Sequence, residues 1–451
     1  MKQGLQKILL LLFLCGSAMA GPPAHEGPVI YAMSIVFAET PFSDIRPAGV
    51  VSKDEVGAKK HFEFLYDSLG RLVELSFKQK SKLIAFSDRF VRAPLTRFSY
   101  TANTETRIFY NEYAQRSLVS GNVYTSQFTL NKQGERASLK FLDLKGNLTE
   151  NDFGIATYQW EELSPHSILE KRYNLQNELV RNRPEFQYMI TRFDFDRRGL
   201  LQTMTNLGES GERITADEAG VVTTQLLYDD ARYLLSWKNL DSLGKPVNGL
   251  TGMAEIKYKP SGYFAEQEAS FWGPEGEPIL TPWGVHRVVY EYDPFGNQTT
   301  RLFYDQKGER TQSRSGLSLL RMTWTDDGQH MSETAFFDKF DQRISIGKST
   351  VHSYKVDFDI NGNPIKTCFY SVGDSKTIYE GLGYFCEEVL FDKKGRKSGL
   401  RFLDKSEKLT LNNFLGLARI CYTYNSMDEL IDVQFLDENN IPVTMEWQAS
   451  H

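Results

Sequence analysis

The feature that most constrains the fold is a large apolar residue followed by an aspartate or another polar residue, repeated along nearly the whole chain. In the best copies a glycine comes three residues after the aspartate, as in Asp67 to Gly70 and Asp293 to Gly296. Aspartate at the first position of a turn accepts hydrogen bonds from the backbone N–H groups ahead of it, and glycine at the fourth supplies a positive φ. We therefore expect each copy to close a β-hairpin, with Gly296 and Gly362 at positive φ.

The repeat has a regular period. Twelve polar positions recur at a mean interval of about 33 residues, and a second turn follows each after about twelve residues. The twelve positions are Asp67, Thr101, Asn131, Glu161, Asp196, Asp229, Lys259, Asp293, Thr325, Asp359, Asp392 and Asn425. The residue before each is large and apolar, and it alternates with polar residues along the preceding segment, which is typical of a strand.

A single hairpin of this length is only marginally stable in water, so the copies must stack to bury their apolar face. The sequence therefore predicts an all-β chain: an array of about twelve stacked antiparallel β-hairpin repeats forming a twisted or spiral sheet or solenoid, with terminal caps. We assign an N-terminal cap to residues 21–60, with a strand over 29–37. The array takes residues 61–443. Residues 444–451 are a C-terminal tail with a short strand around 445–447.

The first 20 residues predict export. Lys2 and Lys7 precede an apolar run over 8–14, and Ala18 and Ala20 are the small residues of a cleavage site. This pattern is typical of a secretory signal peptide. We expect cleavage after Ala20 and a periplasmic or extracellular mature protein. The alternative, a lipoprotein anchored through Cys15, would place a bulky leucine where a small residue is needed. No later segment reaches the ~20 apolar residues of a membrane span.

Charge and cysteine content exclude further classes. The net charge is −6, and the lysines and arginines are spread along the chain. This argues against nucleic acid or an anionic membrane surface as the main partner. After signal removal three cysteines remain. We expect Cys386 and Cys421 on the first strands of neighbouring units, either bridged or simply packed, with packing favoured. A bridge between Cys368 and Cys386 would contradict this layout.

The motif Tyr66-Asp67-Ser68-Leu69-Gly70-Arg71-Leu72 resembles the YD repeats of Rhs-type and teneurin proteins. The longer unit is similar to YD-related repeats of about 33 residues in many exported bacterial proteins. The segments 293–297, 359–363 and 244–246 carry this second likeness. The resemblance implies a spiral antiparallel sheet, which in some members closes into a shell around a toxin. The chain lacks the GRFxSxDP-like core motif of such shells, so a toxin-enclosing role is not implied here.

The sequence shows no pattern typical of catalysis. There is no HExxH, GxSxG, P-loop or CxxC motif. Segment 357–362 resembles the start of a calcium loop, but Cys368 stands where a bidentate glutamate is required. We expect no enzyme activity, no metal and no cofactor.

One segment is unusually rich in aromatic residues. Tyr263, Phe264, Trp272, Trp283 and His286 lie between Tyr258 and Tyr292. Sugar rings stack on exposed aromatic faces, so Tyr263, Trp272, Trp283 and His286 are the candidate ligand-binding residues. The competing interpretation is local filling of a widened core, because aromatic side chains are mostly buried for their area.

We expect an exported, non-enzymatic scaffold that binds a protein or cell-envelope component over an extended β surface. The face opposite the aromatic residues is expected to be of mixed charge, with Glu63, Glu255, Lys257, Glu291, Arg321 and Lys355 on it. The alternatives are a cell-wall or glycan-binding module built on hairpin repeats, and a hydrolase with an unrecognised site.

Overall fold

The computed structural model describes residues 27–85, 93–183, 186–216, 218–263, 265–346 and 350–444. Within these ranges 27 strands form one antiparallel sheet, accompanied by one short helix. The predicted all-β array is therefore confirmed. The expected signal peptide, the strand around 445–447 and Phe264 lie outside the described residues. In the same ranges, no helix is long and apolar enough to cross a bilayer.

Two strands and the helix precede the repeats: β1 (Val29–Ile35), β2 (Pro47–Val51) and α1 (Lys53–Val56). Helix α1 begins with a capping box, in which Ser52 and Glu55 satisfy each other's backbone N–H groups. Strand β1 pairs with β2 on one side and with β3 on the other. The described part of the expected cap thus adds two strands to the same sheet.

Twelve hairpins follow among the described residues, and we number them as units 1 to 12. Units 1 to 6 are β3 (Lys60–Tyr66) and β4 (Leu72–Gln79), β6 (Leu95–Tyr100) and β7 (Thr104–Tyr110), β8 (Thr125–Leu130) and β9 (Arg136–Leu142), β10 (Thr157–Ser164) and β11 (Ser167–Tyr173), β12 (Ile190–Phe195) and β13 (Leu201–Leu207), β14 (Thr223–Tyr228) and β15 (Leu234–Leu240). Units 7 to 12 are β16 (Glu255–Pro260) and β17 (Glu266–Trp272), β18 (Arg287–Tyr292) and β19 (Gln298–Tyr304), β20 (Leu319–Trp324) and β21 (Met331–Phe337), β22 (Ser353–Phe358) and β23 (Pro364–Tyr370), β24 (Cys386–Phe391) and β25 (Lys397–Leu403), β26 (Arg419–Tyr424) and β27 (Leu430–Leu436). The two-residue β5 (Lys82–Leu83) extends β4.

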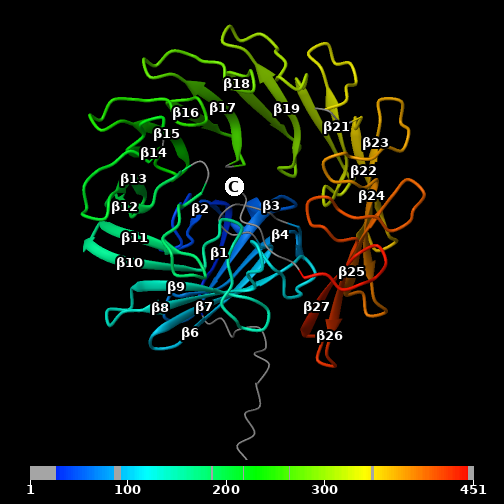
Figure 1. Cartoon of the computed structure of the whole chain (residues 1–451), viewed down its shortest axis with the longest axis horizontal. Coiled ribbons are helices and arrows are strands. Elements are labelled where there is room, and N and C mark those ends of the chain that lie inside the picture. Colours follow the sequence, from blue (N-terminus) through cyan, green and yellow to red (C-terminus); the bar gives the residue numbers. More distant parts are fainter. Residues whose placement is uncertain are drawn as a thin grey trace, which may run out of the picture.

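Each return strand pairs with the first strand of the next unit, as β19 does with β20, so the array is a continuous meander. Within the described residues β2 and β27 are the two edges, and the sheet is open. Figure 1 shows the sheet winding round, with β1 to β4 near the centre and the later units around them. The loops that follow the return strands of the later units lie at the outer edge.

The first turn of each hairpin has the predicted chemistry. In unit 8, the Asp293 N–H donates to Asn297 O at 2.9 Å, and the Asp293 carboxylate accepts from the N–H groups of Phe295 and Asn297. Gly296 and Gly362 have φ values of 82° and 81°, which confirms the positive φ predicted for them. A side chain at either position would force the backbone into a left-handed conformation.

Two of the twelve predicted turn positions are wrong. Glu161 and Lys259 lie inside strands β10 and β16, which run on to Ser164 and Pro260. The turns begin instead at Ser164 and Ser261, whose hydroxyls accept from backbone N–H groups ahead of them. A serine hydroxyl does what the aspartate carboxylate does elsewhere. In both units the apolar residue assigned to the strand end therefore lies further inside the strand.

A third turn, seen in the units whose outer loops the structure describes, was not predicted. It follows the second turn and leads into the next first strand; in unit 7 the Thr281 N–H donates to Val285 O at 2.9 Å. Its glycines have positive φ and recur at the period of the repeat: Gly154, Gly220, Gly252, Gly284, Gly316, Gly383 and Gly416. This column of glycines is visible in the sequence and would have predicted the third turn.

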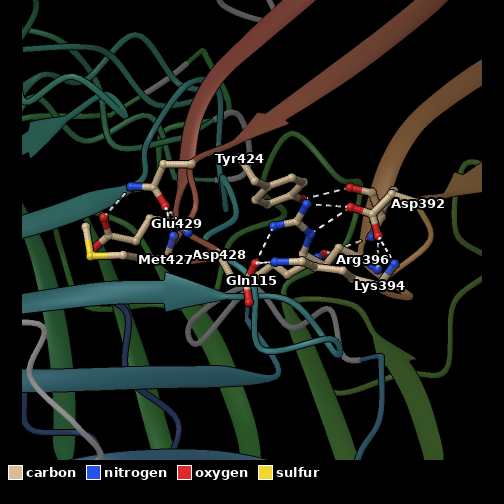
Figure 2. Close-up of polar contacts among 10 residues, drawn as sticks. Gln115, Asp392, Lys394, Arg396, Tyr424, Met427, Asp428 and Glu429 are labelled. Atoms are coloured by element: carbon tan, nitrogen blue, oxygen red, sulfur yellow. Dashed lines mark hydrogen bonds and ion pairs between the residues drawn. The ribbon is translucent and has the colours of Figure 1, made fainter.

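The winding brings distant units into contact. The backbone N–H of Lys60 in unit 1 donates to Phe295 O in unit 8 at 3.1 Å. The second turn of unit 2 reaches unit 11, where the Lys397 N–H donates to Gln115 Oε1 at 3.3 Å and Tyr113 packs edge-on against Phe391. Figure 2 shows Gln115 beside the charged side chains of units 11 and 12.

Burial of the aromatic face changes along the array. The residue three before the first turn is buried in units 1, 2, 3 and 5 as Phe64, Phe98, Phe128 and Phe193. In units 8 to 12 this residue is only half-buried: Tyr290, Met322, Val356, Val389 and Tyr422. The early units are covered by residues 36–46 between β1 and β2, which we call the inner segment. Val36 of this segment belongs to the same core cluster as Phe128 and Phe193.

The predicted cysteine arrangement is wrong. Cys368 and Cys386 form a disulfide, and Cys421 is free. Because the sheet is a meander, the neighbour of first strand β24 is return strand β23, where Cys368 lies directly opposite Cys386. Cys421 on β26 is separated from Cys386 by β25. The mistake was to place the first strands of successive units side by side.

Candidate functional site

The structure distributes the four candidate ligand-binding residues over three separate places. Trp272 ends β17 and its ring contacts His286, with centroids 5.4 Å apart, while Lys257 Nζ lies 4.2 Å from the indole. Trp283 lies in the third turn and packs edge-on against Phe271. Phe271 and Trp272 are consecutive in a strand, so the two tryptophans lie on opposite faces of the sheet.

Tyr263 lies at the other end of the hairpin. It is in the first turn of unit 7, and its ring centroid is 6.0 Å from that of Tyr292 in the next unit. The structure therefore brings Trp272 and His286 together, but it places Trp283 and Tyr263 apart from them. Trp283 is partly exposed, at 39%, and Tyr263 is half-buried.

His286 has a structural role that recurs in the repeat. It is buried, and its Nδ1 lies 3.0 Å from Phe271 O and 3.2 Å from Ile279 O, so the ring N–H donates to a backbone carbonyl. His352 occupies the equivalent position two units later, with Nδ1 3.1 Å from Ile344 O. Both imidazoles hold the outer loop onto the strand that precedes it.

The second turns at the outer edge carry a ladder of ion pairs. In unit 8 this turn has glycine at the left-handed position, but units 9, 10 and 11 have Asp341, Asp374 and Glu407 there, with φ of 60°, 55° and 63°. Each acid pairs with a base of the preceding unit: Arg310 with Asp341 at 3.4 Å, Arg343 with Asp374 at 2.8 Å, and Lys376 with Glu407 at 3.1 Å. These pairs link four successive units along the edge.

Apolar side chains also protrude from the second and third turns. Leu243 and Phe340 lie in second turns and are 78% and 70% exposed, and Phe414 in a third turn is 81% exposed. Large apolar residues that stand out from a surface commonly mark protein contacts. We call Leu243, Phe340, Phe414 and the three ion pairs the outer-edge surface. Sequence reasoning missed it, because each acid pairs with a base 31 residues earlier in the chain.

A cavity of about 770 Å³ opens at the first-turn end of units 1 to 5. Its lining includes Tyr66, Tyr100 and Trp160, together with Arg71 and Arg136. The Arg71 guanidinium lies 4.8 Å from the centroid of Tyr100, whose hydroxyl donates to Leu72 O at 2.9 Å. Burial raises the pKa of Tyr100, so this hydroxyl stays protonated. We call this the larger cavity.

The inner segment is held on the sheet by buried charges. The Glu39 carboxylate accepts from Arg183 at 2.6 and 2.9 Å and from Asn182 at 3.0 Å. Thr40 donates to Glu170, which also pairs with Arg172. Both members of this second pair are completely buried. Buried charges of this kind are tolerated only when they are paired.

The described residues contain no cluster of three or more His, Cys, Asp or Glu that could hold a metal ion. The Asp359 carboxylate, at the start of the calcium-like segment, accepts from the N–H groups of Asn361 and Asn363 and so serves the turn. The largest lysine pKa shift lies at a packing contact. Burial lowers the pKa of Lys60 to about 8, although the negative charge of Asp293 acts to raise it. The Lys60 Nζ lies 3.9 Å from the ring centroid of Trp324.

No known family model matches the chain, and no curated protein sequence matches it. Among solved structures, it is similar to a chain of the crystal structure of TcdB2-TccC3-Cdc42, with 10% identity and a TM-score of 0.24. That match covers 84% of this chain and 26% of the other. A porin-like protein from Bacteroides uniformis is matched with 12% identity and a TM-score of 0.17, over 68% of this chain and 92% of that one. The chain thus spans about a quarter of the Tc toxin chain, and at these scores the similarities carry no functional argument.

Proposed function

We propose that this chain is an exported, non-enzymatic member of the YD-type repeat proteins, and that it binds a protein or cell-envelope component through the outer-edge surface. The observation that carries the proposal is the combination of exposed Leu243, Phe340 and Phe414 with a ladder of ion pairs. Exposed apolar side chains together with charges suit reversible recognition of a protein, in which the apolar residues bind and the charges orient the partner.

The polar face of the strands supports the same proposal. Glu291 and Arg321 are exposed, and Glu255, Lys355 and Glu63 are half-buried in cross-strand contacts. Lys238 pairs with Glu255 at 3.2 Å and Lys78 with Glu63 at 2.6 Å. Because its charges are paired and its surface is polar, this face does not favour aggregation. The exposed apolar residues of the outer-edge surface are therefore the preferred place for a partner to bind.

The test compares capture of envelope and extracellular proteins by three forms of the purified full chain. These are the wild type, the variant Leu243→Ser/Phe340→Ser/Phe414→Ser, and the control Leu69→Ser. Leu69 is 74% exposed but lies in the first turn of unit 1, away from the outer edge. We expect a partner retained by wild type and control and lost by the triple variant, with affinity that falls as salt is raised. A partner bound equally by all three forms would contradict the proposal.

Glycan binding remains a second candidate, and the larger cavity is the observation that favours it. Partly exposed Tyr66 and Tyr100, beside arginines, offer stacking faces and hydrogen-bond donors for sugar rings. Titration with cell-wall oligosaccharides, using Tyr100→Ala and Trp283→Ala, distinguishes this cavity from the predicted patch. Binding that is unaffected by either substitution would exclude both places.

A further inference from the structure

A second cavity lies under the inner segment and adjoins the larger one, since Ile45 and Arg107 line both. Its volume is about 340 Å³, and residues 38–45 form one of its walls. Strands β6 to β10 form the floor with their inward-facing side chains, and the third turns of units 2 and 3 close the remaining side. The floor is largely aromatic, with Phe109, Phe128, Phe141 and Tyr158. A space of this size and lining suits a small, mainly apolar molecule.

Two buried polar groups in the wall of this apolar cavity have no hydrogen-bond partner among the described residues. They are Nη2 of Arg107 and Oγ1 of Thr96. The Arg107 guanidinium lies 4.4 Å from the centroid of Phe128 and 5.4 Å from that of Phe98, so protein groups have replaced water around it. Leaving a buried donor unsatisfied is costly, and such groups call for a partner.

The charges around Arg107 favour an anion as that partner. Arg107 Nε donates to Glu105 Oε1 at 2.7 Å, but Arg136 donates to the other oxygen of the same carboxylate at 2.7 and 2.9 Å. Asp44 also contacts Arg136, at 3.0 Å, from a largely exposed position. Glu39, the acid that lines this cavity, is already paired with Arg183. One buried carboxylate is thus shared by two guanidinium groups.

We propose that the apolar cavity binds a small molecule that has an apolar or aromatic body and a single carboxylate. The carboxylate accepts a hydrogen bond from Arg107 Nη2, and the Thr96 hydroxyl donates to it. The body of the ligand packs on Phe109, Phe141 and Tyr158, under the inner segment. A charge-assisted hydrogen bond is stronger than a neutral one, so the carboxylate selects against neutral analogues. This site is independent of the outer-edge surface.

Calorimetric titration of the full chain with sodium decanoate and with sodium 2-naphthoate tests the proposal. We expect saturable binding of at least one probe at a single site. The neutral analogues, decanol and 2-naphthalenemethanol, should bind at least tenfold more weakly. In Arg107→Met the preference for the acid over the alcohol should disappear, while Glu105 keeps Arg136 as its partner.

Two further variants keep the test decisive. Thr96→Val removes only the hydroxyl, and it should weaken acid binding severalfold without lowering the melting temperature. This variant tests the proposal even if Arg107→Met does not fold. Arg71→Met changes the larger cavity and should leave binding unchanged. The proposal is overturned if no acid binds, if acids and alcohols bind wild type equally, or if Arg71→Met rather than Arg107→Met abolishes binding.

Discussion

Units 1 to 5 and units 8 to 12 are built from the same repeat, yet they are stabilised differently. In the early units Phe193 is completely buried, and the charged groups of Glu39 and Arg183 are paired under the inner segment. In the late units the equivalent aromatic residue, Tyr290, is half-buried, and the ion pairs lie half-exposed at the outer edge. We attribute the difference to residues 36–46, which lie outside the repeats and pack against the core of the early units.

This comparison separates what a repeat specifies from what its surroundings specify. The turn chemistry and strand alternation make a hairpin in every unit, whatever covers it. Burial, and with it most of the stabilisation per unit, depends on a segment that has no repeat pattern. We therefore expect stability to be concentrated in the early units, and the late units to be the more easily opened part of the sheet.

The largest expected effect comes from the aromatic position itself. Phe193→Ala should lower the free energy of unfolding by about 3–5 kcal/mol, because it leaves a cavity in a covered core. Tyr290→Ala, at the equivalent position of unit 8, should cost about 1–2 kcal/mol, since the ring is only partly removed from water. Denaturant titration of both variants measures the two values. Equal losses would mean that the inner segment adds nothing to burial.

Removing one partner of an ion pair should cost more stability in the early units than in the late units. Arg183→Met leaves the Glu39 carboxylate buried beside Asn182 alone, and we expect a loss of about 3 kcal/mol. Arg343→Met removes a half-exposed partner of Asp374, and a loss under about 1 kcal/mol is expected. A small effect for Arg183→Met would show that its pair is not desolvated.

Lys60, which joins unit 1 to units 8 and 9, should make the stability of the protein depend on pH. Burial lowers the pKa of Lys60 to about 8, so between pH 8 and the usual lysine pKa the unfolded state binds more protons than the folded state. Stability contributed at this site therefore rises as pH rises through that window, and below it the cost of burying the charge is fully present. Relative to Lys60→Met, the wild type should gain roughly 2 kcal/mol between pH 7 and pH 10. A constant difference between the two proteins would refute the buried position of the ammonium group.

The smallest effects concern the turns. Gly362→Val should cost about 1–2 kcal/mol, because valine disfavours the left-handed conformation that Gly362 adopts. Asp374→Gly relieves the same strain but loses the pair with Arg343, so we expect a change within about 0.5 kcal/mol of zero. Thermal unfolding of both variants checks these values. A large loss for Asp374→Gly would show that the outer-edge ladder stabilises more than half-exposed pairs usually do.

The sequence predicted the fold from turn chemistry, which is local and therefore readable. It failed where another residue took over the same chemistry, as Ser164 and Ser261 did in place of Glu161 and Lys259. The disulfide was missed for a different reason. The neighbour of a strand in a meander is set by the order of pairing, and Cys368 lies on the strand that we did not place beside Cys386.

The candidate sites were less predictable, because they arise from contacts distant in sequence. Glu39 meets Arg183 across 144 residues, and nothing in the repeat indicates that pair. Trp283 and His286 were chosen as candidates because their segment is rich in aromatic residues, but both belong to repeating positions of the outer loops. Asp341 and Glu407 each pair with a base of the preceding unit, which the sequence alone does not indicate.

Amide hydrogen exchange of the full chain, followed by mass spectrometry, tests most directly whether the inner segment makes the two regions different. The variant is Phe42→Ala, whose ring contacts Trp160 and Phe195 from the inner segment. We predict that in wild type the amides of β8 to β13 exchange more slowly than those of β18 to β27. In the variant, exchange should become faster in β8 to β13 alone. Equal exchange in the two regions of wild type, or a uniform change in the variant, would contradict the account.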